Sequence, residues 1–277
     1  MQGVAAVNVR HVLESLRARL NRVHPERSPV ENTWSNQGYC TTCTSEVTFI
    51  AKHAWLRDHY VCSNCGSIPR ERALMSVLDT WYPDWPQLRI HESSPGRRGA
   101  SIRLARECRS YIPSQFFPDV PLGQSKDQMR CENLEALSFP DGSLDLQISQ
   151  DVMEHVLNPD RAFREIARVL KPGGAHVFTA PLVRKHMDTV TRARQCLDGS
   201  LEHRLEPQYH GNPISDKGSL VATDWGYDIC DFIHRVSGLT TTMIIIDDLS
   251  KGIRAEYIEV LVSRKAGIPC PNSVIAS

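Results

Sequence analysis

The chain has 277 residues, of which 41% are hydrophobic and 23% charged, and 32 basic residues balance 32 acidic ones. This composition fits a globular protein with a sizeable core, built as one large domain or as a large domain plus a small module. The balanced charge argues against a nucleic-acid partner, because domains that bind phosphate backbones usually have a net basic surface. No apolar run is long enough to span a membrane, and the first residues lack the apolar core of a secretory signal, so we expect a cytoplasmic protein.

Residues 1–24 predict an amphipathic helix. Its apolar residues recur at helical spacing and form one stripe, which would pack on the body of the protein or on a partner and so could support an oligomer: Val9, Val12, Leu13, Leu16 and Leu20. Residues 25–38 are polar and irregular and are predicted to be a linker. We therefore expect a helix and linker over residues 1–36.

Four cysteines follow in two closely spaced pairs. Cys40 and Cys43 are separated by two residues, Cys62 and Cys65 likewise, and eighteen residues lie between the pairs. Two such knuckles direct four thiolates at one tetrahedral Zn²⁺, which leaves no position for a reactive water. A zinc-ribbon-like module at residues 37–68 with a structural zinc ion is the prediction. The nine cysteines of the chain, without an export signal, point to a reducing compartment rather than to disulfides.

The next predicted elements alternate between helix and strand. A helix is expected from Pro69 to about Tyr82, a strand at residues 88–91, a helix at about 101–108 and a strand near 110–114. A strand with Leu144, Leu146 and Ile148, a helix near residues 162–170 that ends at Lys171-Pro172-Gly173-Gly174, and a strand at 175–179 then form a right-handed βαβ crossover.

The C-terminal third begins with a long segment that lacks periodicity. Residues 182–225 are rich in His, Pro, Gly and Asp, and a loop of this length inside a domain is more often functional than not. A helix is predicted at 225–237, and strands are predicted at 240–247 and 256–263.

The stretch from Asn133 to Pro181 resembles the second half of a class I S-adenosylmethionine-dependent methyltransferase. The resemblance is carried by the acidic-apolar run before the Pro-Asp-Gly turn, by the Met153-Glu154-His155-Val156 loop, and by the run from Arg164 to Gly174 ahead of the next strand. With weaker flanks it covers roughly residues 87–265. It implies an α/β fold, a doubly wound, seven-stranded and mostly parallel sheet, over residues 69–277 with an insertion at 182–225.

The same resemblance places the methionine end of the cofactor near the first strand. Glu92 stands at the family's acidic position and Gly96 at its central glycine, whereas Ser94 and Arg98 replace the other two glycines and Gly99 is a candidate substitute. Glycines at such a turn let backbone N–H groups approach a ligand closely.

Further cofactor contacts are implied along the sheet. Gln115, or else Asp119, would bind the ribose hydroxyls, although Gln115 lacks the charge of the family's acidic residue. Asn133 would accept a hydrogen bond from the adenine amino group and Leu134 would pack on the adenine. Ser149 and Gln150 would line the methionine moiety.

A hydroxyl acceptor needs a base, and two histidines are the candidates. His155 is placed for this by its position after the fourth strand, although it could instead form a hydrogen bond within the fold, and His210 lies in the insertion. His186 and His203 are the next candidates after these two. A polar and aromatic cluster before the late helix would shape a pocket or fix the loop: Asp224, Trp225, Tyr227 and Asp228.

The sequence thus favours an O-methyltransferase of a small, sugar-like or secondary-metabolite acceptor, with S-adenosylmethionine as cofactor. Two alternatives stay open. One is an RNA methyltransferase whose zinc module grips RNA, and the other is a non-catalytic scaffold with a degenerate cofactor loop.

Overall fold

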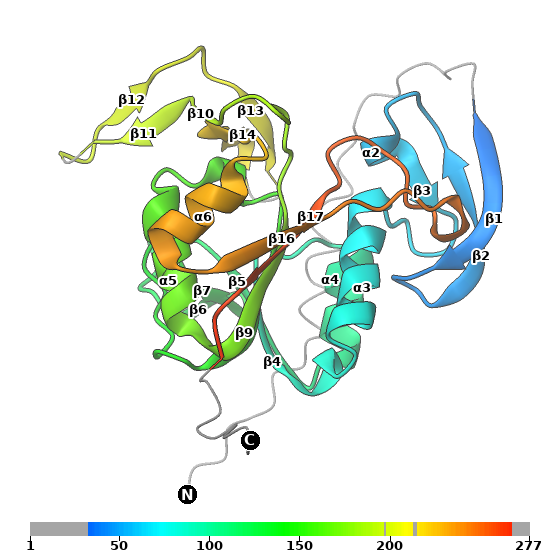
Figure 1. The fold of residues 1–277 in the computed structure, drawn as a ribbon, viewed down its shortest axis with the longest axis horizontal. Coiled ribbons are helices and arrows are strands. Elements are labelled where there is room, and N and C mark those ends of the chain that lie inside the picture. The colour runs from blue at the N-terminus through cyan, green and yellow to red at the C-terminus, as the bar shows by residue number, and fades with distance from the viewer. Residues whose placement is uncertain (1–32, 197, 213–214, 268–277) are drawn as a thin grey trace, which may run out of the picture.

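A computed structural model describes residues 33–196, 198–212 and 215–267 (Figure 1). The helix predicted within residues 1–24 lies outside these ranges. Among the described helices, none combines the length and the apolar character that a bilayer crossing requires.

An eight-stranded, mostly parallel sheet forms the centre of the molecule (Figure 1). Its order is β16-β17-β9-β8-β4-β5-β7-β6, with β17 antiparallel to both neighbours and β6 antiparallel to β7. This confirms the predicted mixed α/β architecture. The strand beyond the predicted seven is β6, a two-residue edge strand that forms a hairpin with β7. The strands are β4 (Arg89–Ser93), β5 (Ser110–Gln115), β6 (Ser125–Lys126), β7 (Met129–Cys131), β8 (Leu144–Gln150), β9 (Leu170–Thr179), β16 (Thr240–Ile244) and β17 (Val260–Arg264).

Helices cover both faces of the sheet (Figure 1). Helices α5 (Pro159–Val169) and α6 (Ile229–Ser237) share one apolar cluster with Phe178 and Leu261, whereas α3 (Pro69–Trp81) and α4 (Gly99–Glu107) share the other with Val177 and Val262. Successive residues of β9 and β17 therefore enter opposite layers, as the two-residue period of a strand requires. A 3₁₀ turn, η1 (Trp85–Gln87), connects α3 to β4.

The four-cysteine segment forms a separate antiparallel sheet of β1 (Trp34–Cys40), β2 (Ser45–Ala51) and β3 (Tyr60–Cys62), with a short helix α2 (Leu56–His59) before β3. β1 begins inside the segment predicted as linker, because the Trp34 ring packs 5.0 Å from that of Tyr60.

This small sheet packs on α3 and on the connection between β16 and β17, which includes η3 (Leu249–Lys251). Arg72 of α3 is buried between them: its guanidinium donates to the carbonyls of Gly252 and Tyr60 and lies 4.7 Å from the centre of the Phe49 ring. The module and the main domain therefore share one interface.

The predicted irregular segment folds into short hairpins next to α6 (Figure 1). Its strands are β10 (Val190–Thr191), β11 (Ala193–Gln195), β12 (Leu201–His203), β13 (Tyr209–Asn212), β14 (Ser215–Leu220) and β15 (Thr223–Asp224). The backbone N–H of Ala222 donates to the carbonyl of Glu154 at 2.7 Å, which fixes the insertion to the 3₁₀ turn η2 (Met153–His155) after β8.

Candidate active site

The carboxyl ends of β4, β5, β8 and β9 meet at one edge of the sheet. In the strand register Ser93 lies beside Ser114 and Ser149, and Gln150 lies beside Thr179. The chain order reverses at β4, which lies between β5 and β8, so this edge is a topological switch point, where open α/β sheets bind ligands.

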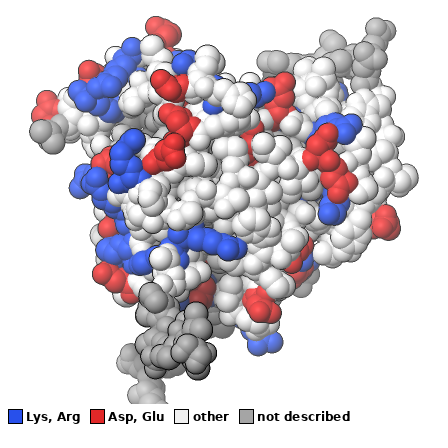
Figure 2. Space-filling view, viewed as in Figure 1, with Lys and Arg blue, Asp and Glu red and all other residues white. Residues whose placement is uncertain are grey.

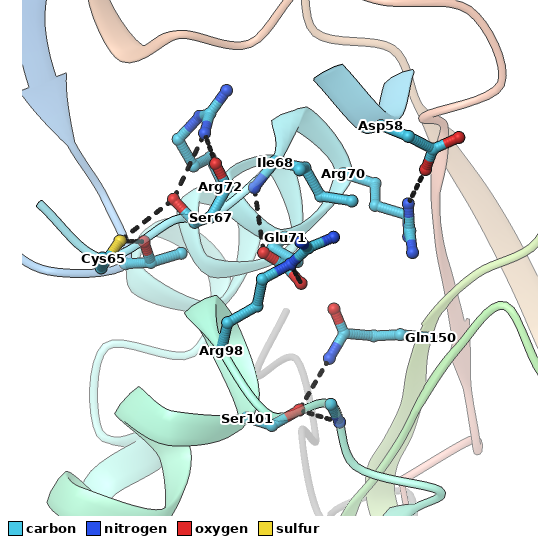
Figure 3. Close-up of polar contacts among 12 residues, drawn as sticks. Asp58, Cys65, Ser67, Ile68, Arg70, Glu71, Arg72, Arg98, Ser101 and Gln150 are labelled. Atoms are coloured by element: carbon cyan, nitrogen blue, oxygen red, sulfur yellow. Dashed lines mark hydrogen bonds and ion pairs between the residues drawn. The ribbon is translucent and has the colours of Figure 1, made fainter. Parts of the chain in front are cut away.

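Glu92 connects three elements at this edge. Its buried carboxylate accepts hydrogen bonds from Tyr111 Oη at 2.6 Å, Ser101 Oγ at 2.7 Å and Gln150 Nε2 at 2.8 Å. Burial raises the pKa of Glu92 above its ordinary value, and these three donors oppose the rise. Ser101 Oγ also accepts the backbone N–H of Gly96 at 2.8 Å, so the loop after β4 is fixed to the start of α4 (Figure 3).

Positive φ angles mark both ends of that loop. Ser94 has φ 54° and donates its N–H to the carbonyl of Ser114, although a serine is strained in this left-handed conformation. Gly99 has φ 55°, and a Cβ there would collide with the carboxylate of Glu71. By contrast, a Cβ on Gly96 would come no closer than 3.5 Å to Ser101 Oγ. The glycine that this backbone most requires is therefore Gly99.

Two arginines that are not among the predicted cofactor contacts lie beside these residues. Arg70 and Arg98 lie on the same side of α3 and α4 as Gln150 (Figure 3). Arg98 Nε is 3.3 Å from Glu71 Oε1, and Arg70 Nη1 is 3.1 Å from Asp58 Oδ1. The Pro69-Arg70-Glu71 start of α3, directly after the second cysteine pair, was the available signal.

Asp151, the residue after β8, has φ 51°, and its carboxylate accepts hydrogen bonds from Arg57 and Thr179 and forms an ion pair with Arg70. Arg57 Nη2 lies 2.7 Å away, Arg70 Nε 2.9 Å and Thr179 Oγ1 3.0 Å. Burial alone would raise the pKa of Asp151, but Arg70 and Arg57 lower it below its ordinary range. Because Arg57 belongs to α2, between the two cysteine pairs, the small module supplies a charged side chain to the end of β8.

The two histidines predicted as bases lie against each other. The rings of His155 and His210 are 5.3 Å apart, nearly perpendicular, and burial lowers the pKa of both. His155 Nδ1 lies 2.8 Å from the carbonyl oxygen of Leu220, and its Nε2 lies 3.7 Å from Glu154 Oε1. Burial, with a smaller contribution from Asp151, raises the pKa of Glu154 to about 8. The catalytic role of His155 and His210 stays a prediction.

The other predicted cofactor residues have varied surroundings. Gln115 ends β5, and Leu134 belongs to the buried cluster around α5. Asn133 Oδ1 accepts the N–H of Glu135 at 2.9 Å, which uses one of its lone pairs. The buried Ser149 hydroxyl lies 3.0 Å from His176 Nε2, inside the layer below α5. Its side chain thus contacts the core, whereas Gln150 lies beside Glu92.

The secondary candidates of the insertion lie elsewhere. His203 pairs with Ala193 in an exposed hairpin, and the His186 ring is 4.9 Å from that of Tyr227. Asp224 forms an ion pair with Arg192 at 2.7 Å, Asp228 accepts from Thr189, and Trp225 is buried beside Phe163. In the described residues this cluster holds the loop in place.

The four cysteines converge as their spacing predicts. Their sulfur atoms all lie within 4.8 Å of one another, with Cys40 3.8 Å from Cys65 and Cys43 3.9 Å from Cys62. Thiolates bound to one tetrahedral zinc ion lie about 3.8 Å apart. Burial and the neighbouring thiol of Cys40 raise the pKa of Cys43 to about 11, so four thiolates would need a cation between them. The donor set fits zinc.

An open hollow of about 480 Å³ lies at the other end of the sheet, lined by Tyr82, Gly173, Thr240, Arg264 and Lys265 among others. These residues adjoin the amino end of β16 and the carboxyl end of the antiparallel β17, away from the polar junction at Glu92. The hollow and the candidate active site at Glu92 therefore share no residues.

Part of the chain is similar in sequence to known methyltransferases. A family model described as a methyltransferase domain matches residues 114–178, which run from the end of β5 into β9. Glycine/sarcosine/dimethylglycine N-methyltransferase of Actinopolyspora halophila is 30% identical over 108 residues, 35% of this chain and 19% of the relative. The ubiquinone/menaquinone biosynthesis C-methyltransferase of Hahella chejuensis is 39% identical over 120 residues, 39% of this chain and 48% of the relative. The chain thus spans about half or less of the curated relatives it matches.

Solved structures with partial likeness include an S-adenosylmethionine-dependent methyltransferase from Mesorhizobium loti, which is 18% identical with a TM-score of 0.44 over 70% of this chain and 98% of the other. The [4+2]-cyclase SpnF is 15% identical with a TM-score of 0.43, and the likeness covers 94% of this chain and 93% of the cyclase. Residues 114–178 carry the sequence of a methyltransferase domain, set in the mixed α/β fold with a mostly parallel sheet that is expected of the S-adenosylmethionine-dependent class.

Proposed function

We propose that this protein is an S-adenosylmethionine-dependent methyltransferase that acts on an oxygen of a small, sugar-like or secondary-metabolite acceptor. The observation that carries the proposal is the junction of Glu92, Ser101 and Gln150 where β4 and β8 end, within and beside the matched methyltransferase sequence. It places a carboxylate and an amide at the edge where this fold class binds its cofactor.

The residues around this junction suit the parts of the donor. Glu92 lies where a carboxylate would favour the cationic methionine end, and the half-exposed guanidinium of Arg98 would attract the carboxylate of the methionine moiety. Gln115 can hydrogen-bond a ribose diol through its amide, and Asn133 keeps its Nδ2 hydrogens and one oxygen lone pair for adenine. Leu134 would pack on the adenine face.

The chemistry requires alignment and removal of one proton. When bound, S-adenosylmethionine supplies a methyl group on a sulfonium, to which an in-line nucleophile adds as the carbon–sulfur bond breaks. His155 can accept the proton of a hydroxyl at Nε2, because its Nδ1–H donates to the carbonyl of Leu220. His210, whose ring faces that of His155, is the second candidate base.

We propose that the zinc ion is structural. Four thiolates would complete its coordination shell, and the fold of the module around it holds α2, and with it Arg57, against Asp151. Loss of the ion would therefore act on the site through the positions of Arg57 and Asp58, the two residues of α2 that form ion pairs there.

The RNA-binding alternative is weakened by the charges of the module. Arg57 and Arg70, which an RNA-binding surface would need, form ion pairs with Asp151 and Asp58. On the face drawn in Figure 2, basic and acidic groups lie interspersed among the described residues. A polyanion prefers a continuous basic surface.

Methyl transfer from isotopically labelled S-adenosylmethionine tests the proposal. Label should enter small hydroxylated acceptors in an ether linkage and should not enter RNA. Label in an amine, a carbon or RNA would overturn the oxygen or small-molecule assignment. Binding of the donor without transfer to any of these acceptor classes would favour the non-catalytic scaffold.

A further inference from the structure

Glu154, His155 and His210 each offer one ligand atom, and these three atoms lie within 4.8 Å of one another. Two of the residues belong to η2 after β8, and the third comes from β13 of the insertion. We infer that they bind one divalent transition-metal ion, at a second metal site distinct from the four cysteines.

The orientation of His155 is that of a metal ligand. A carbonyl oxygen can only accept, so the 2.8 Å contact with Leu220 places the ring proton on Nδ1 and leaves the Nε2 lone pair bare. Histidines that bind metals usually donate their other ring N–H in this way, which fixes the tautomer and the ring orientation.

The gap between the ligand atoms fits an ion. His155 Nε2 lies 3.7 Å from Glu154 Oε1, which is beyond hydrogen-bond range. Nitrogen and oxygen atoms bound at about 2.0–2.1 Å to one tetrahedral ion lie about 3.4 Å apart, so small side-chain movements would complete the geometry.

Glu154 supplies an independent observation. Its side chain is 2% exposed, and Oε2 has no hydrogen-bond partner among the described residues. A buried carboxylate oxygen without a partner is costly, since burial removes water without replacing its hydrogen bonds. A cation bound by this carboxylate, through Oε1 or through Oε2, would compensate its charge.

The insertion holds the three residues together through its backbone. Leu220 of β14 orients His155, Ala222 N–H donates to the carbonyl of Glu154, and β14 pairs with the strand that carries His210. The insertion is therefore a part of the site.

The nearby charges allow a cation. The guanidiniums of Arg57 and Arg70 oppose one, but both pair with Asp151, and Arg70 also pairs with Asp58. With Glu154 ionised, the five groups carry one more negative than positive charge.

The ligand set selects the class of ion. Two imidazoles and one carboxylate suit Zn²⁺, Co²⁺ or Fe²⁺ better than Mg²⁺ or Ca²⁺, which prefer oxygen ligands. Three protein ligands leave a coordination position open, as in catalytic zinc sites.

The consequence for catalysis rests on the proposed function. The open position would take the acceptor hydroxyl, whose pKa the ion would lower so that its proton passes to water before methyl transfer. His155 and His210 would then hold the ion and would not act as bases. The favoured acceptor would carry a hydroxyl able to reach this ion.

Titration of Co²⁺ into the full chain, with zinc already bound to the cysteines, tests the site directly. One further equivalent should bind and give weak visible absorption without a thiolate charge-transfer band. Glu154→Gln and His210→Gln should each raise the dissociation constant at least about tenfold. His203→Gln, a histidine of the same insertion outside the cluster, should bind Co²⁺ as the wild type does.

The inference is overturned if the wild type binds no Co²⁺ beyond the cysteine site, if the bound Co²⁺ shows thiolate charge transfer, or if both variants bind as the wild type does. Calorimetry with S-adenosylmethionine keeps the two proposals apart. Co²⁺ binding without donor binding refutes the methyltransferase proposal alone, whereas donor binding without Co²⁺ binding refutes the second metal site alone.

Discussion

Asp151 shows how a single residue connects the small module to the sheet. Its backbone is left-handed, and its carboxylate joins Arg57 of α2, Arg70 of α3 and Thr179 of β9. A buried carboxylate with several partners is stable only while those partners remain. Removing a partner of Asp151 therefore tests the contact between the module and the end of β8.

Arg57→Ala should lower the free energy of unfolding by about 2 kcal/mol at pH 7, because the buried Asp151 loses one of its two guanidinium partners. Urea unfolding followed by circular dichroism measures the change. Arg254→Ala, which removes an exposed pair with Asp247, is the matched control and should have little effect. Equal losses in the two variants would mean that the Arg57 contact is no stronger than a surface pair.

A row of buried polar side chains inside the sheet makes stability depend on pH. His91 lies between Gln147 and Ser114 at 2.5 and 2.6 Å, and His176 stacks on Phe178. Burial lowers the pKa of His91 to about 4 and that of His176 to about 3. Because unfolded histidine binds a proton near pH 6.5, the unfolded chain binds more protons below that pH, and stability falls as the pH falls toward 4.

His176→Phe should reduce the loss of unfolding free energy between pH 7 and pH 5 by about 2 kcal/mol, because one histidine no longer binds a proton on unfolding. Urea midpoints measured across that range give the slope. The exposed His203→Gln variant should keep the wild-type slope. An unchanged slope in His176→Phe would show that His176 is already protonated in the folded protein.

Among the elements, the cysteine knuckles and α2 form one unit. The two cysteine pairs flank β2 and α2, the helix that carries Arg57, so a bound metal ion would fix both elements. If this module binds the proposed zinc ion, a segment of its size would depend on the metal for most of its folding free energy.

Cys62→Ser should weaken the thiolate charge-transfer band of the Co²⁺-substituted protein, because three of the four thiolates remain, and should lower Tm by about 5–10 °C. Absorption spectroscopy and thermal unfolding measure the two effects. Cys196→Ser, in the insertion, should preserve both the band and Tm. A Cys62→Ser protein with an intact band would exclude the four-cysteine site.

The connection between β16 and β17 is the second element that holds the module. Gly252 has φ 64°, and a Cβ there would lie 2.6 Å from atoms of the Phe49 ring. Gly142 has φ 57°, but no atom lies within 4 Å of its Cβ position. The two positions thus share a left-handed backbone, which glycine adopts without strain and alanine does not, and they differ in packing.

Gly142→Ala should cost about 1 kcal/mol of unfolding free energy from strain alone, and Gly252→Ala about 2–4 kcal/mol from strain plus the collision. Chemical denaturation of both variants measures the difference. If the two alanines cost the same, Phe49 does not pack rigidly against this connection.

For the whole molecule, the features that short stretches of sequence determine could be predicted, whereas the features that depend on long-range contacts could not. The α5 helix and its flanking strands followed from the spacing of residues such as Phe163 and Ile166, which are buried as expected. The four-cysteine cluster followed from ligand spacing, and the strand order agrees with the resemblance. The residues that determine each of these features lie close together in the sequence.

Other features depend on tertiary contacts that no local pattern carries. Arg57 and Asp151 are 94 positions apart, and neither belongs to a motif that predicts their pairing. Helix α6 begins at Ile229 rather than at Trp225, because the backbone of Trp225 and Tyr227 bonds to residues 184 and 185 instead. The hairpins of the insertion are likewise short and mostly polar, so they lack the alternation that marks a strand.

S-adenosylmethionine should bind at the sheet edge that carries Glu92 and Gln150. Calorimetric titration of the full chain with that compound tests it most directly, with Gln150→Ala as the site variant and Gln195→Ala, in an exposed hairpin, as control. We expect one binding event in the wild type and in Gln195→Ala, and at least about tenfold weaker binding in Gln150→Ala. No binding to the wild type, or equal binding to all three proteins, would contradict the account.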